Sequence, residues 1–181
     1  MTADAKAPIG HHDDIHLESA MSMKEILFVC TGNIFRSMIA ERALRHAAGS
    51  GLLYRFASAG TQATPQGMTD LVRDGLLERA IDPTEHRQRK LTPEIIGAVD
   101  LAVAIGCDHA AFIDQHYSLK VPLFNEIAHG RREAILDTWE AVPDYAENAV
   151  ARNLHIHQVI AHICDSAPRF LKRLPSFLNL C

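Results

Sequence analysis

A cysteine and an arginine separated by five residues stand in the stretch "ILFVCTGNIFRSMIAE", near the start of the chain. Cys30 follows an apolar, strand-like run, and Arg36 begins a helix-like run. A thiolate is a strong nucleophile, and a guanidinium presents a planar fork that matches two oxygens of a phosphate. These two residue types at this spacing therefore predict nucleophilic attack on a bound phosphoryl group.

The turn between the two residues has the composition of an anion cradle. Gly32 and Asn33 tolerate positive φ angles, which a tight loop of this kind requires. The loop opens directly into a helix, so its backbone N–H groups and the helix dipole can converge on one anion. Such a cradle holds a phosphate dianion and also stabilises a thiolate. We expect the phosphate to be surrounded by Thr31, Gly32, Asn33, Ile34, Phe35, Arg36 and Ser37.

A thiolate beneath a bound phosphoryl group is placed for in-line attack, which gives a covalent thiophosphate on Cys30 that water later hydrolyses. The Ser37 hydroxyl can donate to the sulfur. Arg36 and the loop amides meet the charge of the transferring group, so no metal or other cofactor is expected. In the bland alternative, Cys30 is a small buried residue and Arg36 an exposed residue at a helix start. The buried strand, the Gly-Asn pair and the following helix favour the catalytic interpretation.

Alternating apolar runs and amphipathic stretches predict an α/β fold. Strands are expected at 25–29, 52–61, 100–105 and, as an edge strand because of Pro122, at 120–124. Helices are expected at 37–48, 68–80 and 108–116, after a cap at Thr92, and from about 147 to 165. This order predicts one domain of three layers, with helices on both faces of a four-stranded parallel sheet. Ligands bind at the carboxyl ends of such strands, where Cys30 stands.

Composition and charge narrow the class of protein. The net charge of -4 gives no case for a nucleic-acid or membrane partner. The four cysteines are widely spaced and form no C-x-x-C pair, which is typical of free thiols in a reducing compartment. No apolar run has the length of a membrane span, and residues 1–23 lack the pattern of a secretory signal. We therefore expect a cytoplasmic protein with a disordered extension at 1–23 and a folded domain at 24–181.

The stretch "VCTGNIFRSMIAE" closely resembles the signature C-x-G-N-x-C-R-S of the low-molecular-weight protein tyrosine phosphatases. The similarity continues in "ASAGT", "GMTDLVRDGLLERAIDPTEHRQRKLTPE" and "DLAVAIGCDH", from about residue 24 to 165. The resemblance implies a compact α/β domain around a four-stranded parallel sheet. It also implies a hydrolase that acts on a phosphotyrosine protein or a small aryl phosphate.

The resemblance assigns roles residue by residue. Cys30 corresponds to the nucleophile, Arg36 to the phosphate-binding arginine, and Ser37 to the hydroxyl partner of the sulfur. Asn33 corresponds to the asparagine that holds the loop in shape, and Ser58 and His86 to positions that brace this asparagine. Ser58 and His86 also have a simple alternative, as a serine that ends a strand and a solvated histidine of a loop.

The general acid is where the sequence departs from the family, which carries it in a D-P-Y type motif before the last long helix. The corresponding stretch here is "DTWEAVPDYAEN". Asp144 is favoured as the acid, with Tyr145 after it as an aromatic wall for a phenyl phosphate. Asp137 is the substitute acid and Trp139 the substitute aromatic. Pro143 before Asp144 and Glu147 three positions after it are also compatible with a helix N-cap.

Two further departures lie in the loop itself. Phe35 stands where most relatives have a second cysteine, so a reversible disulfide with the nucleophile would need another partner. Met38 stands where many relatives have proline, which we expect to affect rigidity more than chemistry.

Two rival functions remain open. Thioredoxin- or glutaredoxin-coupled arsenate reductases share this fold and relay oxidation through two further cysteines. Cys107 stands within one residue of the first relay position, but "DHAAFIDQH" lacks the second, so Cys164 or Cys181 would have to serve. The other rival is a phosphate- or phosphoprotein-binding module that has lost its acid.

Three remaining features have simple interpretations. His155, His157 and His162 are read as one helix surface rather than a metal site, because no acidic or thiol ligand accompanies them. The basic run "HRQRK" at 86–90 is read as a solvated loop, with an acidic partner as the alternative. The apolar tail is expected to pack on the domain or to form a homodimer contact through Phe170, Leu171, Leu174, Phe177 and Leu178.

Overall fold

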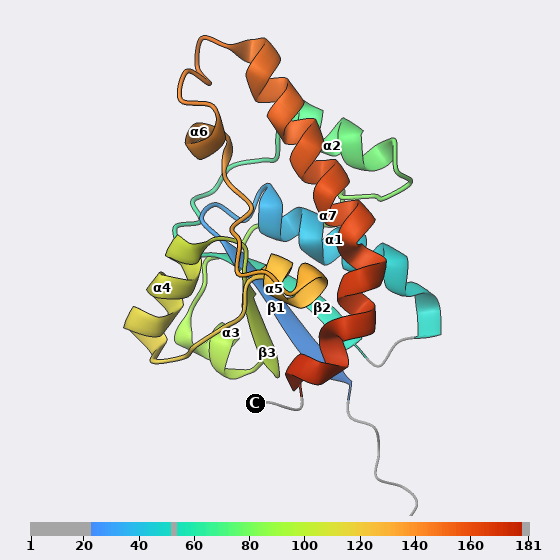
Figure 1. Cartoon of the computed structure of the whole chain (residues 1–181), viewed down its shortest axis with the longest axis vertical. Coiled ribbons are helices and arrows are strands. Elements are labelled where there is room, and N and C mark those ends of the chain that lie inside the picture. The colour runs from blue at the N-terminus through green and yellow to red at the C-terminus, as the bar shows by residue number, and fades with distance from the viewer. Residues whose placement is uncertain (1–22, 52–53, 179–181) are drawn as a thin grey trace, which may run out of the picture.

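The computed structural model describes residues 23–51 and 54–178 of the chain. Three parallel strands form its sheet in the order β2-β1-β3, with bounds β1 (Lys24–Cys30), β2 (Tyr54–Gly60) and β3 (Leu101–Ala104) (Figure 1). Residues 26–29 of the central strand are fully buried, as expected of a run that is apolar on both faces. The predicted strands at 25–29, 52–61 and 100–105 are therefore confirmed, except that residues 52 and 53 lie outside the described residues.

The prediction of a fourth strand at 120–124 is wrong in the described structure. Only one residue of this segment pairs with the sheet, through an isolated parallel bridge between Ala104 and Leu123. Pro122 has no N–H to donate, although its carbonyl accepts the N–H of Ala104 at 3.0 Å. The chain then turns at once into α5 (Phe124–His129), so no further ladder can form.

The helices make the two outer layers. One face of the sheet is covered by α1 (Arg36–Ala48), α2 (Asp70–Leu77), α5 and α7 (Ala149–Leu178), and the other by α3 (Pro93–Gly97) and α4 (Cys107–Tyr117). Ile26 and Phe28 point into the first layer, whereas Leu27 and Val29 point into the second, as the period of a strand requires. A short 3-10 turn (Gly49–Gly51) follows α1, and the single-turn helix α6 (Thr138–Ala141) precedes the last helix. The predicted three-layer α/β arrangement is thus confirmed, with three strands in place of four.

The helix boundaries differ from the sequence-based expectation at two places. The second helix is shorter than the predicted 68–80, because Thr69 caps it through the N–H of Val72 and a turn with Ala80 at φ +58° follows its end. The last helix is much longer than the predicted 147–165, and it contains Pro168 and Pro175. Packing of its apolar face outweighs the loss of hydrogen bonds at the two prolines.

The apolar tail packs on the core as part of α7. Phe170 and Leu174 are fully buried, and the ring of Phe170 lies 5.6 Å from that of Phe28 and 5.0 Å from that of Phe124. These two residues are therefore not available on the surface, and a homodimer through this tail stays a prediction. Within the described ranges, no helix is both long and apolar enough to cross a membrane.

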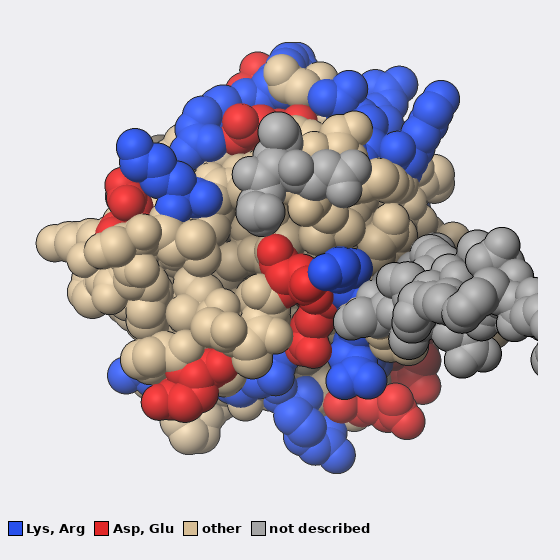
Figure 2. All heavy atoms as spheres, turned by 90° about the horizontal axis from the view of Figure 1, so that it is seen from below, with Lys and Arg blue, Asp and Glu red and all other residues tan. Residues whose placement is uncertain are grey.

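Figure 2 views the molecule from below, where β1 begins and α7 ends. Basic and acidic side chains are interspersed on this face with uncharged ones. Lys24 and Asp100 form an ion pair of 2.7 Å that joins the start of β1 to the residue before β3. The carboxyl ends of the strands lie at the other end of the sheet, and with them lies the loop 31–35, which we call the phosphate loop after the ligand predicted for it.

Candidate active site

The loop 31–35 joins the carboxyl end of β1 to the start of α1, and Cys30 is the last residue of the strand. Asn33 has φ +55°, the left-handed conformation that the tight turn needs. The end of β2 approaches the loop so closely that a side chain at Gly60 would lie 2.5 Å from the carbonyl oxygen of Thr31. Because residue 60 is glycine, the end of β2 can pack directly against the backbone of the loop.

The Cys30 thiol meets donors from its own loop. Its Sγ lies 2.9 Å from Ser37 Oγ, and the backbone N–H of Asn33 donates to it at 3.3 Å. The backbone N–H groups of Ile34 and Phe35 form no hydrogen bond to another described residue, so they are available to an anion. This arrangement has both properties predicted from the sequence, a sulfur supported by donors and a set of free amides at a helix start.

Asn33 is the centre of the network that shapes the loop. Its Nδ2 donates to Ser37 Oγ at 3.1 Å and to Ser58 Oγ at 2.8 Å. Its backbone carbonyl accepts from His86 Nε2 at 2.7 Å, and its Oδ1 accepts from the N–H of Arg89 at 2.9 Å. Burial lowers the pKa of His86, in keeping with a neutral ring that donates to a carbonyl. The structure thus brings Ser58 and His86 against Asn33.

Glu41 completes this network and was missed by the sequence analysis. Ser58 Oγ donates to Glu41 Oε2 at 2.5 Å, and the carboxylate, almost buried, also pairs with Arg45 at 3.0 Å. Because Ser58 gives its proton to Glu41, it accepts from Asn33. Because Asn33 in turn donates to Ser37, the Ser37 proton is free for the sulfur. An acidic residue four positions after Ser37, on the buried face of one helix, was the signal available in the sequence.

Arg36 is buried and is held by a segment far away in the sequence. Its Nη1 donates to the carbonyl of Ile135 at 3.0 Å, and its Nη2 forms a short ion pair with the Asp137 carboxylate. Glu140 lies 3.8 Å from the same guanidinium. Asp137 is the N-cap of α6, where its Oδ1 accepts the N–H of Thr138 at 2.7 Å. The single turn of helix therefore fixes a carboxylate beside Arg36, the arginine predicted to bind phosphate.

Asp144 and Tyr145 lie in the turn between α6 and α7. The Asp144 carboxylate accepts from Asn148 Nδ2 at 3.0 Å, and Tyr145 is 42% exposed. Neither side chain forms a hydrogen bond or ion pair with the loop 31–35 in the described structure. The structure therefore brings Asp137, the substitute in the sequence analysis, to Arg36, and it does not bring Asp144 there. Trp139 follows on α6 and is 59% exposed.

His109 is a second residue that the sequence analysis missed. Its ring is fully buried at the start of α4, where Nδ1 accepts the N–H of Gly106 at 2.9 Å. Nε2 therefore carries the proton and donates to Thr31 Oγ1, also at 2.9 Å. Burial, and then the charge of Arg36, lower the pKa of His109 to about 4, although Asp108 and Asp137 oppose the shift. His109 thus ties α4 to the loop as a neutral imidazole.

This burial predicts acid sensitivity. An unfolded histidine has a pKa of about 6.5, so between pH 6.5 and 4 the unfolded chain binds a proton at His109 that the folded chain does not. The stabilisation is therefore complete above about pH 6.5 and is lost as the pH falls towards 4, by on the order of 3 kcal/mol. Urea unfolding at pH 7 and pH 4.5 should show this loss in the wild type, and a smaller one in His109→Gln, whose amide can still donate to Thr31. Equal losses in both proteins would contradict the prediction.

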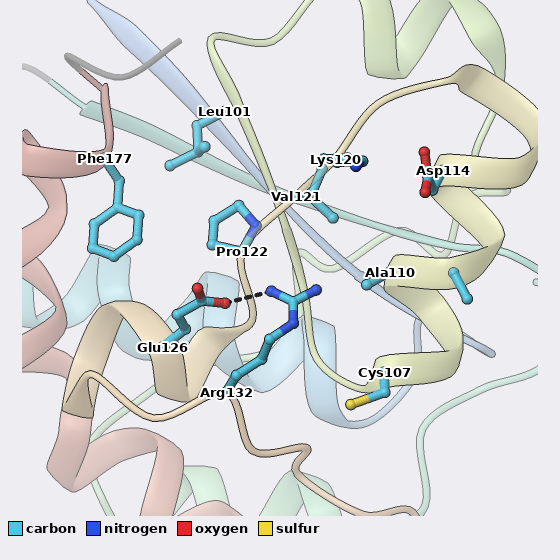
Figure 3. Close-up of a pocket in the computed structure, with 11 residues that line it drawn as sticks. Leu101, Cys107, Ala110, Asp114, Lys120, Val121, Pro122, Glu126, Arg132 and Phe177 are labelled. Atoms are coloured by element: carbon cyan, nitrogen blue, oxygen red, sulfur yellow. Dashed lines mark hydrogen bonds and ion pairs between the residues drawn. The ribbon is translucent and has the colours of Figure 1, made fainter.

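The described cysteines Cys30, Cys107 and Cys164 are all free thiols. Cys107 lies on the wall of a cavity of about 600 Å³ between α4, the 120–122 segment and α5 (Figure 3), and no residue of the loop 31–35 lines this cavity. Burial raises the pKa of Cys164 to about 11, so this thiol stays protonated at neutral pH. Cys181 lies outside the described residues. The described thiols therefore give the arsenate reductase hypothesis no support.

Two of the three histidines of α7 have protein partners. His162 Nε2 lies 2.7 Å from Asn125 Oδ1, and His155 Nε2 lies 3.2 Å from the Leu136 carbonyl oxygen. Over the described ranges, no group of three or more His, Cys, Asp and Glu side chains is arranged to hold a metal ion. These contacts favour the interpretation of a partly buried helix surface.

The fold and the loop are shared with known proteins. A model of the family described as low molecular weight phosphotyrosine protein phosphatase matches residues 25–176. The chain belongs to this family. Among its relatives, a protein-arginine-phosphatase of Bacillus subtilis is 34% identical over 118 residues, which are 62% of this chain and 78% of the relative.

Relatives named for different activities have comparable sequence identity to this chain. Low molecular weight protein-tyrosine phosphatase A of Mycobacterium tuberculosis is 40% identical over 95 residues, 50% of this chain and 57% of that relative. A solved structure of the YwlE arginine phosphatase, a cysteine-to-serine mutant with a phosphorylated active-site serine, superposes with a TM-score of 0.71 and 26% identity. The superposition covers 83% of this chain and 95% of the YwlE chain. Membership of the family therefore leaves phosphotyrosine and phosphoarginine as substrates to distinguish.

Proposed function

We propose that the protein is a metal-independent phosphatase of phosphorylated protein side chains that acts through a phosphocysteine on Cys30. The observation that carries the proposal is the convergence on one loop of a buried thiol, unbonded backbone amides and an arginine paired with a carboxylate. Each group answers one requirement of phosphoryl transfer: a nucleophile, a cradle for the charge and a proton donor.

In the first step, the phosphoryl group binds to the loop amides and Arg36 and displaces the Asp137 carboxylate from the guanidinium. The Cys30 sulfur attacks phosphorus, an S–P bond forms, and the bond from phosphorus to the leaving atom breaks. Once released from Arg36, the Asp137 carboxylate takes up the proton that the Cys30 thiol loses and passes it to the leaving atom, so that Asp137 ends the step as a carboxylate. The Ser37 hydroxyl, whose proton is directed at the sulfur by the Asn33 network, stabilises the attacking thiolate.

In the second step, water attacks the phosphocysteine. The carboxylate formed in the first step accepts a proton from this water, the S–P bond breaks, and the Cys30 thiolate and inorganic phosphate are released. A phosphorylated serine in the related YwlE mutant supports a covalent intermediate at this position.

We assign the acid to Asp137 in preference to Asp144. The support is its ion pair with Arg36, which holds the carboxylate beside the position of the transferring group. The neighbouring sequence agrees as well, because Asp137-Thr138-Trp139 carries an aromatic residue two positions after the aspartate, as a D-P-Y motif does. In this arrangement Trp139, rather than Tyr145, is the aromatic wall next to the substrate.

Phosphotyrosine is the substrate that the side chains at the site favour. Ile34 is half-buried on the loop and Trp139 is exposed on α6, two positions after the acid. Apolar and aromatic surfaces of this kind suit a flat phenyl ring. The family description supports the same assignment.

Phosphoarginine is the second candidate. The Bacillus relative that is 34% identical is a protein-arginine-phosphatase. In this chain, Asp137 and Glu140 lie together at Arg36, and two carboxylates could also accept the N–H groups of a guanidinium leaving group.

Peptides that differ only in the phosphorylated residue distinguish the two candidates. We expect a phosphotyrosine peptide to be hydrolysed at least about tenfold faster, in kcat/KM, than the matched phosphoarginine peptide in the presence of a chelator. The reverse order would make the protein an arginine phosphatase. Tight phosphate binding without turnover of either peptide would favour a binding module, and thioredoxin-dependent reduction of arsenate that is lost in Cys107→Ala would favour the reductase.

A further inference from the structure

The basic run at 86–90 lies against the phosphate loop rather than free in solvent. Gln88 Nε2 donates to the carbonyl of Gly32 at 2.5 Å, and the N–H of Arg89 donates to Asn33 Oδ1 at 2.9 Å. The backbone of Lys90 then pairs with Gly60 at the end of β2. The run is therefore held at a fixed position beside the catalytic cysteine.

A cavity of about 390 Å³ opens beside this run, between residues 63–66 and 88–90; we call it the flank pocket. Two residues of its wall, Gln66 and Gln88, also lie next to Gly32 of the loop. The N–H of Gln66 donates to Gln88 Oε1 at 3.0 Å, and a Cβ on Gly32 would lie 3.8 Å from Gln66 Nε2. A peptide whose phosphorylated residue enters the loop can therefore place a neighbouring side chain in the flank pocket.

The charge of the flank pocket has one sign. Arg89 and Lys90 line it, and no carboxylate is among the described residues of its wall. Lys90 is exposed and its ammonium group has no hydrogen bond or ion pair with another described residue. Arg87 belongs to the same basic run. Within the described structure its guanidinium donates hydrogen bonds only to the carbonyls of Thr84 and His86.

Several surface arginines of the described structure already have a carboxylate partner. Arg73, Arg79 and Arg132 each form an ion pair with a carboxylate at 2.6 to 2.8 Å. The cations at the flank pocket have no such carboxylate within the described structure, so an acidic group of a bound molecule can supply the partner.

We propose that the flank pocket receives an acidic side chain of the protein substrate, next to the phosphorylated residue, and thereby selects phosphorylation sites in acidic sequences. The proposal rests on the proposed phosphatase function. The carboxylate would pair with Lys90 and with the outer nitrogens of Arg89, whose Nε is already bonded to the Ser58 carbonyl at 2.7 Å. Since these contacts are solvent-exposed, selection is expected to weaken in salt.

Two phosphopeptides test this selection. They carry the phosphorylated residue that the preceding experiment identifies, and they differ only in having Glu or Gln at the positions flanking it. For the wild type at low salt we expect kcat/KM to be roughly threefold to tenfold higher for the Glu peptide, and this ratio to approach one in about 1 M salt.

The Lys90→Glu variant should bring the ratio to one or below, because the new carboxylate repels the acidic peptide. Lys120→Glu is the matched control: it makes the same change in net charge, but Lys120 lies at the 600 Å³ cavity, away from the loop (Figure 3), and should retain the wild-type ratio. Arg89 is left unchanged because its backbone N–H bonds to Asn33 of the loop and its Nε bonds to the Ser58 carbonyl of β2.

Each outcome decides the question. Equal turnover of the two peptides by the wild type overturns the inference and leaves the proposed function intact. A loss of selection in Lys120→Glu equal to that in Lys90→Glu also overturns it, because the effect then comes from net charge. No turnover of either peptide, or of any phosphorylated probe, removes the proposed function and the inference together.

Discussion

Cys30→Ser is expected to reduce hydrolysis of p-nitrophenyl phosphate by at least about a thousandfold at neutral pH in the presence of a chelator. The serine can keep the hydrogen bonds to Ser37 and to the N–H of Asn33, so the cradle should persist. What is lost is the nucleophile, since a serine hydroxyl without an adjacent base is a much weaker nucleophile than a cysteine sulfur. The initial rates of both proteins, with thermal unfolding as a check on folding, measure this effect.

Cys107→Ser is the matched control for this substitution. Cys107 is exposed and lies on the wall of the 600 Å³ cavity, which no residue of the phosphate loop lines. The same sulfur-to-oxygen change at this site should leave the rate within about twofold of the wild type. A folded Cys30→Ser protein that retained most of its activity would refute attack by this thiol.

Asp137→Asn should lower kcat by roughly a hundredfold to ten thousandfold for a phosphotyrosine peptide, and by less for p-nitrophenyl phosphate. The nitrophenolate leaves readily without a proton, whereas the tyrosine oxygen needs one. Asparagine can still cap α6 at the N–H of Thr138, so the segment that carries it should remain folded. Parallel measurement of kcat for the two substrates reads out proton donation separately from substrate binding.

Asp144→Asn provides the comparison. In the described structure, the Asp144 carboxylate accepts a hydrogen bond from Asn148 and forms none with the phosphate loop. We expect it to change kcat less than about threefold for either substrate. If Asp144→Asn instead caused the large, leaving-group-dependent loss and Asp137→Asn did not, the sequence-based assignment would be restored and that of the structure rejected.

The difference between these two aspartates shows where sequence reasoning stops. Both lie in one short stretch before the last helix, and both can be matched to a loose D-P-Y pattern. The ion pair that selects Asp137 joins residues 101 positions apart in the sequence. Local pattern carries no information on which loop conformation brings a carboxylate over the arginine, because that conformation depends on how α6 is capped and how Ile135 meets Arg36.

Helix and strand ends show the same division. The end of α1 and the start of α3 follow local rules, a glycine after the last turn and a Thr-Pro start, and both were predicted. The fourth strand and the length of α7 were not. Pairing at 120–124 depends on what the neighbouring strand offers, and the extension of α7 past Pro168 depends on burial of Phe170 in an aromatic cluster.

The sequence by itself determined the loop that we propose to be catalytic. The proposed nucleophile, the arginine, the hydroxyl partner and the left-handed asparagine lie within eight consecutive residues, and the preceding apolar run and following helix fix their geometry locally. The tertiary structure alone decided the groups that act on this loop from other segments: Glu41 through Ser58, His109 on Thr31, Asp137 on Arg36, and the cations of the flank pocket. Apart from Glu41, these groups reach the loop from segments distant in sequence. Such contacts arise only when the strands assemble and bring their carboxyl ends to one edge of the sheet.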